Sequence, residues 1–133
     1  GLNSLKNLQL DNNRLNCVDD QLLKVFRDLE ILTLNNNNLS SLHLDGLSAA
    51  PRLRSLRLAD NPLRCSGPAA ACLAAALRAA PRLAGGGARC GSPAALRGSF
   101  KNYTLPIDCR KSFRLTLKNS WFFSCVDNYQ HSG

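Results

Sequence analysis

The stretch LKNLQLDNNRL (residues 5–15) decides the fold, because the chain repeats its pattern twice more. Residues 29–39 read LEILTLNNNNL and residues 53–63 read LRSLRLADNPL, so each copy begins 24 residues after the last. Four leucines and one asparagine recur in phase as L-x-x-L-x-L-x-x-N-x-L. Self-similarity at a fixed period indicates a chain built from stacked copies of one structural unit.

The Leu-x-Leu core of each copy alternates apolar and polar positions, which is the period of a β-strand. The pattern resembles the leucine-rich-repeat signature, whose period is roughly 20–29 residues. We therefore expect an α/β leucine-rich-repeat solenoid with a short parallel sheet on its concave face and leucines pointing inward. Asn13, Asn37 and Asn61 follow the strands, where a side-chain amide can both donate to and accept from buried backbone groups.

The polar positions beside each Leu-x-Leu define the expected concave face. This surface is polar with one apolar position, Ile31, and suits contact with a protein. The alternative is that it is simply solvated. The candidate binding residues are Asn7, Gln9, Asp11, Ile31, Thr33, Asn35, Ser55 and Arg57.

With 133 residues the chain fits one domain, and no apolar stretch is long enough to cross a membrane. No signal peptide precedes the first repeat. We therefore expect a fragment of a longer secreted protein, whose first leucines (Leu5, Leu8, Leu10 and Leu15) are exposed at an open end.

Charge divides the chain in two. Residues 1–60 are neutral, with seven basic and seven acidic side chains, so the net charge of +8 lies entirely in residues 61–133. Such asymmetry favours a polyanion partner, which outside cells would be heparan sulfate. The alternative is a compositional bias toward alanine and arginine; nucleic acid is not expected, because no nucleic-acid-binding motif occurs. The candidate polyanion-binding residues are Arg78, Arg82, Arg89, Arg97, Lys101, Arg110 and Lys111.

Six cysteines allow 15 disulfide connectivities. Four of them, between positions 65 and 109, directly follow the last repeat, which favours a disulfide-stapled C-terminal cap in an oxidising compartment. No metal site is expected, because the spacings do not provide the close Cys-x-x-Cys pairs of a zinc site and both histidines lie outside the cluster.

The segments NPLRC (61–65) and CGSPAALRG (90–98), followed by Cys109, resemble the cysteine-rich flank of extracellular leucine-rich-repeat proteins. KNLQLDNN (6–13) and residues 26–39 are similar to Slit, a family of secreted axon-guidance ligands, at the end of a leucine-rich domain. The resemblance implies disulfides Cys65–Cys90 and Cys72–Cys109, with Cys72 replacing the second cysteine of the family's Cys-x-Cys pair. The cap helix should begin near Pro68 and stop before Pro81, with its alanine-rich face covering the last leucines only weakly.

Three parts follow from these patterns. Residues 1–64 contain three repeats, residues 65–109 form the cap, and residues 110–133 are a tail without resemblance that we expect to be disordered. Cys17 is either a free, partly buried thiol or bonded to Cys125. The sequons at Asn38 and Asn102 are candidate glycosylation sites.

No catalytic constellation occurs, so neither an enzyme nor a cofactor is expected. The sequence predicts an extracellular protein-recognition module resembling part of a Slit ligand, with heparan sulfate as a second partner of its basic half. The alternatives are a piece of another leucine-rich-repeat adhesion receptor, which a transmembrane segment further along the gene would indicate, and a non-functional truncated product.

Overall fold

The computed structural model describes residues 4–19, 21–44, 47, 50–83, 87–93, 98–106 and 108–109. The tail predicted for residues 110–133 lies outside the described residues. In chain order the elements are β1 (Asn7–Gln9), α1 (Leu22–Val25), β2 (Ile31–Thr33), β3 (Ser55–Arg57), β4 (Leu63–Arg64), α2 (Gly67–Arg78), η3 (Pro81–Leu83), β5 (Cys90–Ser92) and η5 (Phe100–Asn102).

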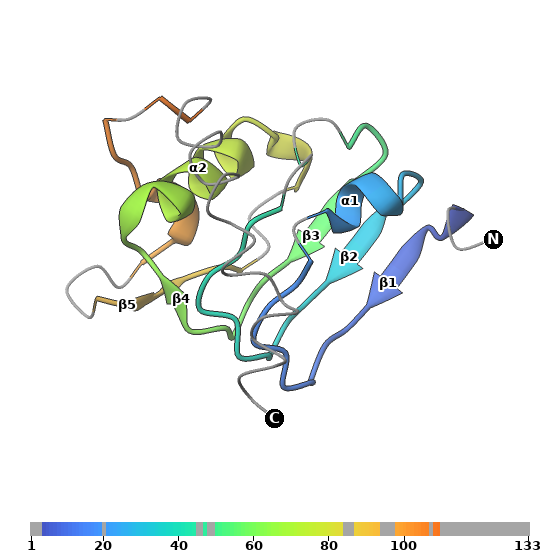
Figure 1. Cartoon of the computed structure of the whole chain (residues 1–133), viewed down its shortest axis with the longest axis horizontal. Coiled ribbons are helices and arrows are strands. Elements are labelled where there is room, and N and C mark those ends of the chain that lie inside the picture. The colour runs from blue at the N-terminus through green and yellow to red at the C-terminus, as the bar shows by residue number, and fades with distance from the viewer. Residues whose placement is uncertain are drawn as a thin grey trace.

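Each repeat contributes one strand to a three-stranded parallel sheet of order β1-β2-β3, as the alternating leucines predicted (Figure 1). The register follows the 24-residue period, because Leu8 pairs with Leu32 and Leu32 pairs with Leu56. The central leucines of β2 and β3 point to one side of the sheet and are buried. The polar neighbours of these leucines consequently share the opposite side.

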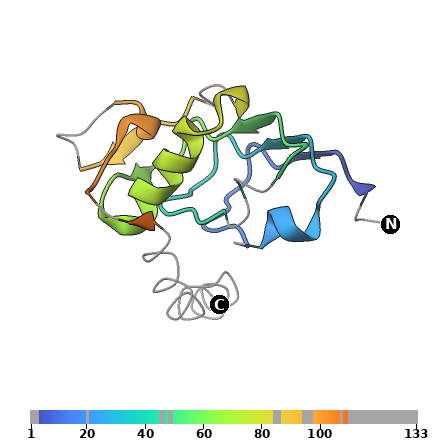
Figure 2. The ribbon, with the colours of Figure 1, turned by 90° about the horizontal axis from the view of Figure 1, so that it is seen from above.

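The leucine core lies between the sheet and the return segments of the repeats. Seen from above, α1 and the loops lie across the core from the strands (Figure 2). Leu22 and Leu23 of α1 are buried in this core. Just before α1, the side chain of Asp19 accepts a hydrogen bond from the backbone N–H of Gln21 (2.9 Å).

The first repeat packs less completely than the other two. Leu5, Leu8, Leu10 and Leu15 are half-buried against the core, whereas the corresponding leucines of the second repeat are at most 2% exposed. The expected exposure of the first leucine layer is therefore partial, because the second repeat covers one side of it.

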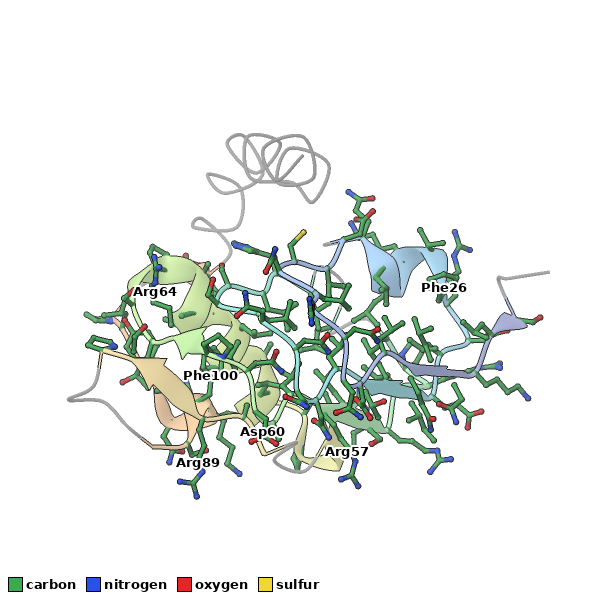
Figure 3. The ribbon with its side chains drawn as sticks, turned by 90° about the horizontal axis from the view of Figure 1, so that it is seen from below. Phe26, Arg57, Asp60, Arg64, Arg89 and Phe100 are labelled. Carbon is green, nitrogen blue, oxygen red and sulfur yellow. A yellow bond between two sulfur atoms is a disulfide. The ribbon has the colours of Figure 1, made fainter. Side chains whose placement is uncertain are left out.

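The cap helix α2 runs from Gly67 to Arg78, close to the predicted range. The buried side chains are Ala70, Ala71, Leu73 and Ala74, whereas Ala69, Cys72 and Ala76 are only half-buried. The sequence also predicted a weak seal, yet Leu56, Leu58 and Leu63 are at most 2% exposed. Phe100 explains the difference, since η5 lies against α2 and its ring is buried beneath the cap (Figure 3).

Two disulfides tie the cap together. Cys65 is bonded to Cys90 and Cys72 to Cys109, with Cα–Cα distances of 5.5 and 5.4 Å, the same pairs that the resemblance implied. The first bridge is buried beside the pairing of β4 with β5. Cys17 is also disulfide-bonded, with a partner outside the described residues, so the free-thiol alternative is wrong.

Candidate protein-interaction surface

The candidate surface is the side of the sheet opposite the leucine core, here called the polar sheet face and defined by the side chains that flank the central leucines. Strand pairing aligns them into two rows, Asn7–Ile31–Ser55 and Gln9–Thr33–Arg57. The structure therefore brings together six of the eight predicted binding residues on one face. Asn7, Gln9 and Arg57 are exposed, while Ile31 and Ser55 are half-buried.

Thr33 departs from the prediction. It occupies the middle of its row, between Gln9 and Arg57, but is only 6% exposed. Its hydroxyl Oγ1 is buried and has no hydrogen-bond partner among the residues that the structure describes. A partner resting on this face would therefore contact the neighbours of Thr33 rather than Thr33 itself.

Asp11 and Asn35 hold neighbouring repeats together. The backbone N–H of Asn35 donates to Oδ1 of Asp11 (2.8 Å), and the backbone N–H of Ala59 donates to Oδ1 of Asn35 (2.9 Å). The third repeat has Ala59 at the equivalent position, which offers no side-chain acceptor. There the cap packs against the repeat instead, since a Cβ added to Gly87 would lie 2.9 Å from the Cβ of Ala59. One oxygen of each of the two predicted binding residues is thus already engaged in the fold.

The repeat asparagines Asn37 and Asn61 have the structural role that the sequence predicted. Nδ2 of Asn61 donates to the carbonyl oxygens of Leu34, Leu58 and Ala59 at 2.9, 3.1 and 3.2 Å, while its Oδ1 accepts from the N–H of Leu39. Asn37 makes the equivalent contacts one repeat earlier. Both asparagines are buried, so they fix the turn below the polar sheet face and do not reach a partner.

The residue before the asparagine of each repeat (Asn13, Asn37 or Asn61) has a left-handed backbone. Asn12, Asn36 and Asp60 have φ of 58°, 56° and 59°. Asparagine and aspartate tolerate this conformation better than other non-glycine residues. Nδ2 of Asn36 also donates to Oδ1 of Asn12 (2.8 Å), which links two exposed turns at the edge of the polar sheet face.

Ion pairs occupy the other border of this face. Arg54 of the third repeat lies 3.5 Å from Glu30 of the second, and Arg52 lies 3.5 Å from Asp28, the residues just before these two repeats begin. All four side chains are at least 35% exposed, so water weakens both pairs. The pairs nevertheless leave Arg52 and Arg54 with an acidic neighbour.

Two of the predicted polyanion-binding residues have structural contacts instead. Nη1 of Arg78 donates to the carbonyl oxygens of Lys101 and Tyr103 at 2.6 and 3.0 Å. Arg82 donates from Nε to Leu53 (2.9 Å) and from Nη2 to Ala50 (3.1 Å). No sequence pattern indicates these contacts, since the partners lie 23 to 32 residues away.

The structure describes two of the remaining predicted basic residues. Arg89 and Lys101 are exposed on the cap. Arg97, Arg110 and Lys111 lie outside the described residues. Arg78 and Arg82 are exposed, but their guanidiniums donate to backbone carbonyls, and polyanion binding at these residues stays a prediction.

Arg57 and Arg89 extend from the same side of the molecule. Viewed from below, both side chains point away from the strands with their nitrogens outward, and Arg64 lies across the cap (Figure 3). Arg57 and Arg89 are exposed, and the guanidinium of neither forms a hydrogen bond or ion pair with any part of the chain that the structure describes. The sequence placed these two arginines in separate candidate sites.

Both sequons are on the surface. Asn38 is exposed, and its Nδ2 donates to Oδ1 of Asn16 (2.8 Å). Asn102 ends η5 and is exposed, as is Thr104 of the same sequon. Glycosylation at either position stays a prediction.

The described residues contain neither a candidate metal site nor a candidate membrane span. No group of three or more His, Cys, Asp or Glu side chains among them lies close enough together to hold a metal ion. Over the same ranges, no helix has both the length and the apolar character needed to span a membrane.

Comparison with known proteins agrees with the repeat architecture. Residues 3–63 match the family described as Leucine rich repeat, so this part of the chain contains leucine-rich repeats. The chain is also similar to Nephrocan from Mus musculus, with 35% identity over 63 residues. That match covers 47% of this chain and 12% of Nephrocan, so the chain spans only a small part of that relative.

Proposed function

We propose that this chain is an extracellular protein-recognition module that binds a partner protein through the polar sheet face. The observation that supports this function is the division of the sheet into two sides. Leucines fill one side completely, while the other presents exposed amides and a guanidinium at Asn7, Gln9 and Arg57. Regular strands hold these groups at fixed spacing, which lowers the entropy cost of binding a partner.

The cap supports an extracellular location. Two disulfides close the end of the repeats, and structural disulfides form and persist in oxidising compartments. The similarity of its repeats to Slit supports a more specific role as part of a secreted guidance ligand. The similarity to Nephrocan supports the broader alternative, that the chain is part of another leucine-rich-repeat protein.

Heparan sulfate is a second proposed partner, which rests on the basic composition of the cap and on exposed Arg89 and Lys101. Salt-dependent retention on heparin tests it. Elution at or below physiological salt would contradict a specific polyanion site, because screening removes weak contacts between exposed charges first.

A glycan placed on the polar sheet face tests the main proposal. Gln9→Thr creates a sequon at exposed Asn7 without touching the leucine core. The protein is secreted from mammalian cells, and its saturable binding to a panel of cell surfaces is measured before and after enzymatic removal of glycans. We expect the Asn7 glycan to abolish binding, and its removal to recover only part of the binding, because positions 7 and 9 both remain altered.

The native sequon provides the matched control. Ser40→Ala removes the acceptor motif at Asn38, which lies at a turn outside the polar sheet face, and should leave binding unchanged. Undiminished binding by the fully glycosylated Gln9→Thr variant would contradict the proposal, provided that mass spectrometry shows the glycan at Asn7.

A further inference from the structure

Arg57 and Arg89 are the feature of the polar sheet face that its general description leaves unexplained. Arg57 is at the end of the row that starts at Gln9, and Arg89 comes from the loop that precedes β5. The loop reaches the sheet at Gly87, whose Cβ position is 2.9 Å from Ala59, two residues after Arg57. The cap thereby supplies a second arginine to the end of a surface built by the repeats (Figure 3).

These two guanidiniums differ from the other arginines around them. Arg54 and Arg52 have carboxylate neighbours, and Arg82 is held by two backbone carbonyls. In contrast, neither Arg57 nor Arg89 has a side-chain partner among the described residues. An exposed guanidinium without an internal partner keeps its planar set of donors for a carboxylate of another molecule.

The rest of the surface indicates what accompanies those carboxylates. The two rows of the polar sheet face also present a hydroxyl group at Ser55, an amide group at Gln9 and one half-buried apolar side chain at Ile31. A peptide offers backbone hydrogen bonds and apolar side chains to such a surface. A sulfated polysaccharide offers neither apolar side chains nor a use for Ile31, and it prefers a longer array of free cations.

We infer that the partner presents an acidic peptide segment to this face, with its carboxylates on Arg57 and Arg89. The inference rests on the proposed function and specifies the chemistry of its partner. Asp60 lies on the same side of the molecule (Figure 3) and forms no ion pair with either arginine, so it weakens the attraction for a carboxylate. Neutralising Asp60 should therefore strengthen the binding of an acidic segment, whereas neutralising the two arginines should weaken it.

Fluorescence anisotropy with a short fluorescein-labelled peptide of alternating glutamate and serine tests the inference. We expect salt-sensitive binding that the double variant Arg57→Gln/Arg89→Gln weakens by about tenfold or more. Asp60→Asn should strengthen binding, since asparagine tolerates the left-handed backbone at this position. A peptide with glutamine in place of glutamate should not bind.

The control is a double variant with the same change in net charge elsewhere. Arg27→Gln/Arg64→Gln neutralises two exposed arginines outside the two rows of the polar sheet face, one after α1 and one in β4, and should leave peptide binding unchanged. Circular dichroism of all variants checks the fold. Equal weakening by both double variants would overturn the inference, because it would assign binding to overall charge.

Three other outcomes also overturn it. Equal binding of the glutamine peptide would show that carboxylates are not recognised. Loss of heparin retention in Arg57→Gln/Arg89→Gln without any peptide binding would assign the arginines to a polysaccharide. If the peptide fails to bind while the Asn7 glycan still blocks binding to cells, the acidic segment is wrong and the proposed function stands.

Discussion

Asn61 of the third repeat donates a hydrogen bond from Nδ2 to the carbonyl oxygen of Leu34 in the second repeat, over 2.9 Å. The same amide nitrogen lies within 3.2 Å of two carbonyls of its own turn, and its oxygen accepts from Leu39. One buried side chain thus satisfies backbone groups in two coils that are 24 residues apart. The spacing of the repeats and the chemistry of the amide together hold the coils in register.

Asn61→Asp should destabilise the chain strongly. The substitution keeps the shape but replaces the donating amide with a carboxylate, whose charge would face three carbonyl oxygens in a buried turn. We expect the free energy of unfolding to fall by about 3 kcal/mol or more, as for other uncompensated buried charges. Urea denaturation followed by circular dichroism, with disulfides intact, measures the loss.

Asn13→Asp is the matched control for that substitution. Asn13 is exposed and its Nδ2 donates to two carbonyls within its own repeat. Its replacement should cost only about 1 kcal/mol. Equal losses at the two positions would show that contact between repeats contributes little.

Arg82 links the cap to the third repeat through its two hydrogen bonds to Leu53 and Ala50. Arg82→Met keeps most of the aliphatic chain but leaves both carbonyls without this donor. We expect a loss of about 2 kcal/mol in the same denaturation measurement, since hydrogen bonds from charged donors are worth about 1.5–3 kcal/mol. Arg89→Met removes an exposed guanidinium without such contacts and should change stability by less than about 0.5 kcal/mol. A smaller effect at position 82 than at position 89 would refute the structural role.

Thr33 has a buried hydroxyl without a hydrogen-bond partner in the described part of the chain, so replacing this hydroxyl by a methyl group should not destabilise the fold. Thr33→Val removes an unsatisfied polar group while keeping a similar shape, and should stabilise the fold by up to about 1 kcal/mol. Thr33→Ser keeps the hydroxyl but loses a methyl group, and should cost about 1 kcal/mol. Thermal unfolding of the two variants beside wild type provides the test. A destabilised Thr33→Val would mean that the hydroxyl is bonded after all.

The parts of this structure that the sequence predicted are those that repeat. Three copies of one pattern specify the strand positions, the inward leucines and the roles of Asn37 and Asn61, because each copy must make the same contacts with its neighbour. The two rows of the polar sheet face follow from the same periodicity. Thr33 shows the limit even there, because its burial depends on the neighbouring side chains and not on the pattern.

The cap has no periodicity, and there the sequence was less informative. The contacts of Arg78 and Arg82 join segments more than 20 residues apart, so basic side chains that read as a solvent-facing patch are partly bound to backbone carbonyls. Phe100 completes the seal from a short helix far along the chain, which the alanine-rich face of α2 did not suggest. The position of Arg89 beside the repeats likewise follows from the contact of Gly87 with Ala59.

The two cap disulfides should differ in how readily they are reduced. Cys65 and Cys90 are buried, at 1% and 8% exposed, whereas Cys72 and Cys109 are half-buried. A reductant must reach a sulfur atom, so access favours attack on Cys72–Cys109. Brief treatment with a limiting phosphine reductant, followed by alkylation and peptide mass spectrometry, should label Cys72 and Cys109 before Cys65 and Cys90.

The double variant Cys72→Ala/Cys109→Ala provides the control, because it leaves only the buried bridge in the cap. Its remaining cap cysteines should be labelled slowly at low denaturant and rapidly once urea opens the fold. The missing bridge should also lower the free energy of unfolding by about 2–5 kcal/mol. Early labelling of Cys65 and Cys90 in the native wild-type protein would mean that the cap opens as a whole, and that Phe100 and Arg82 do not hold it against the last repeat.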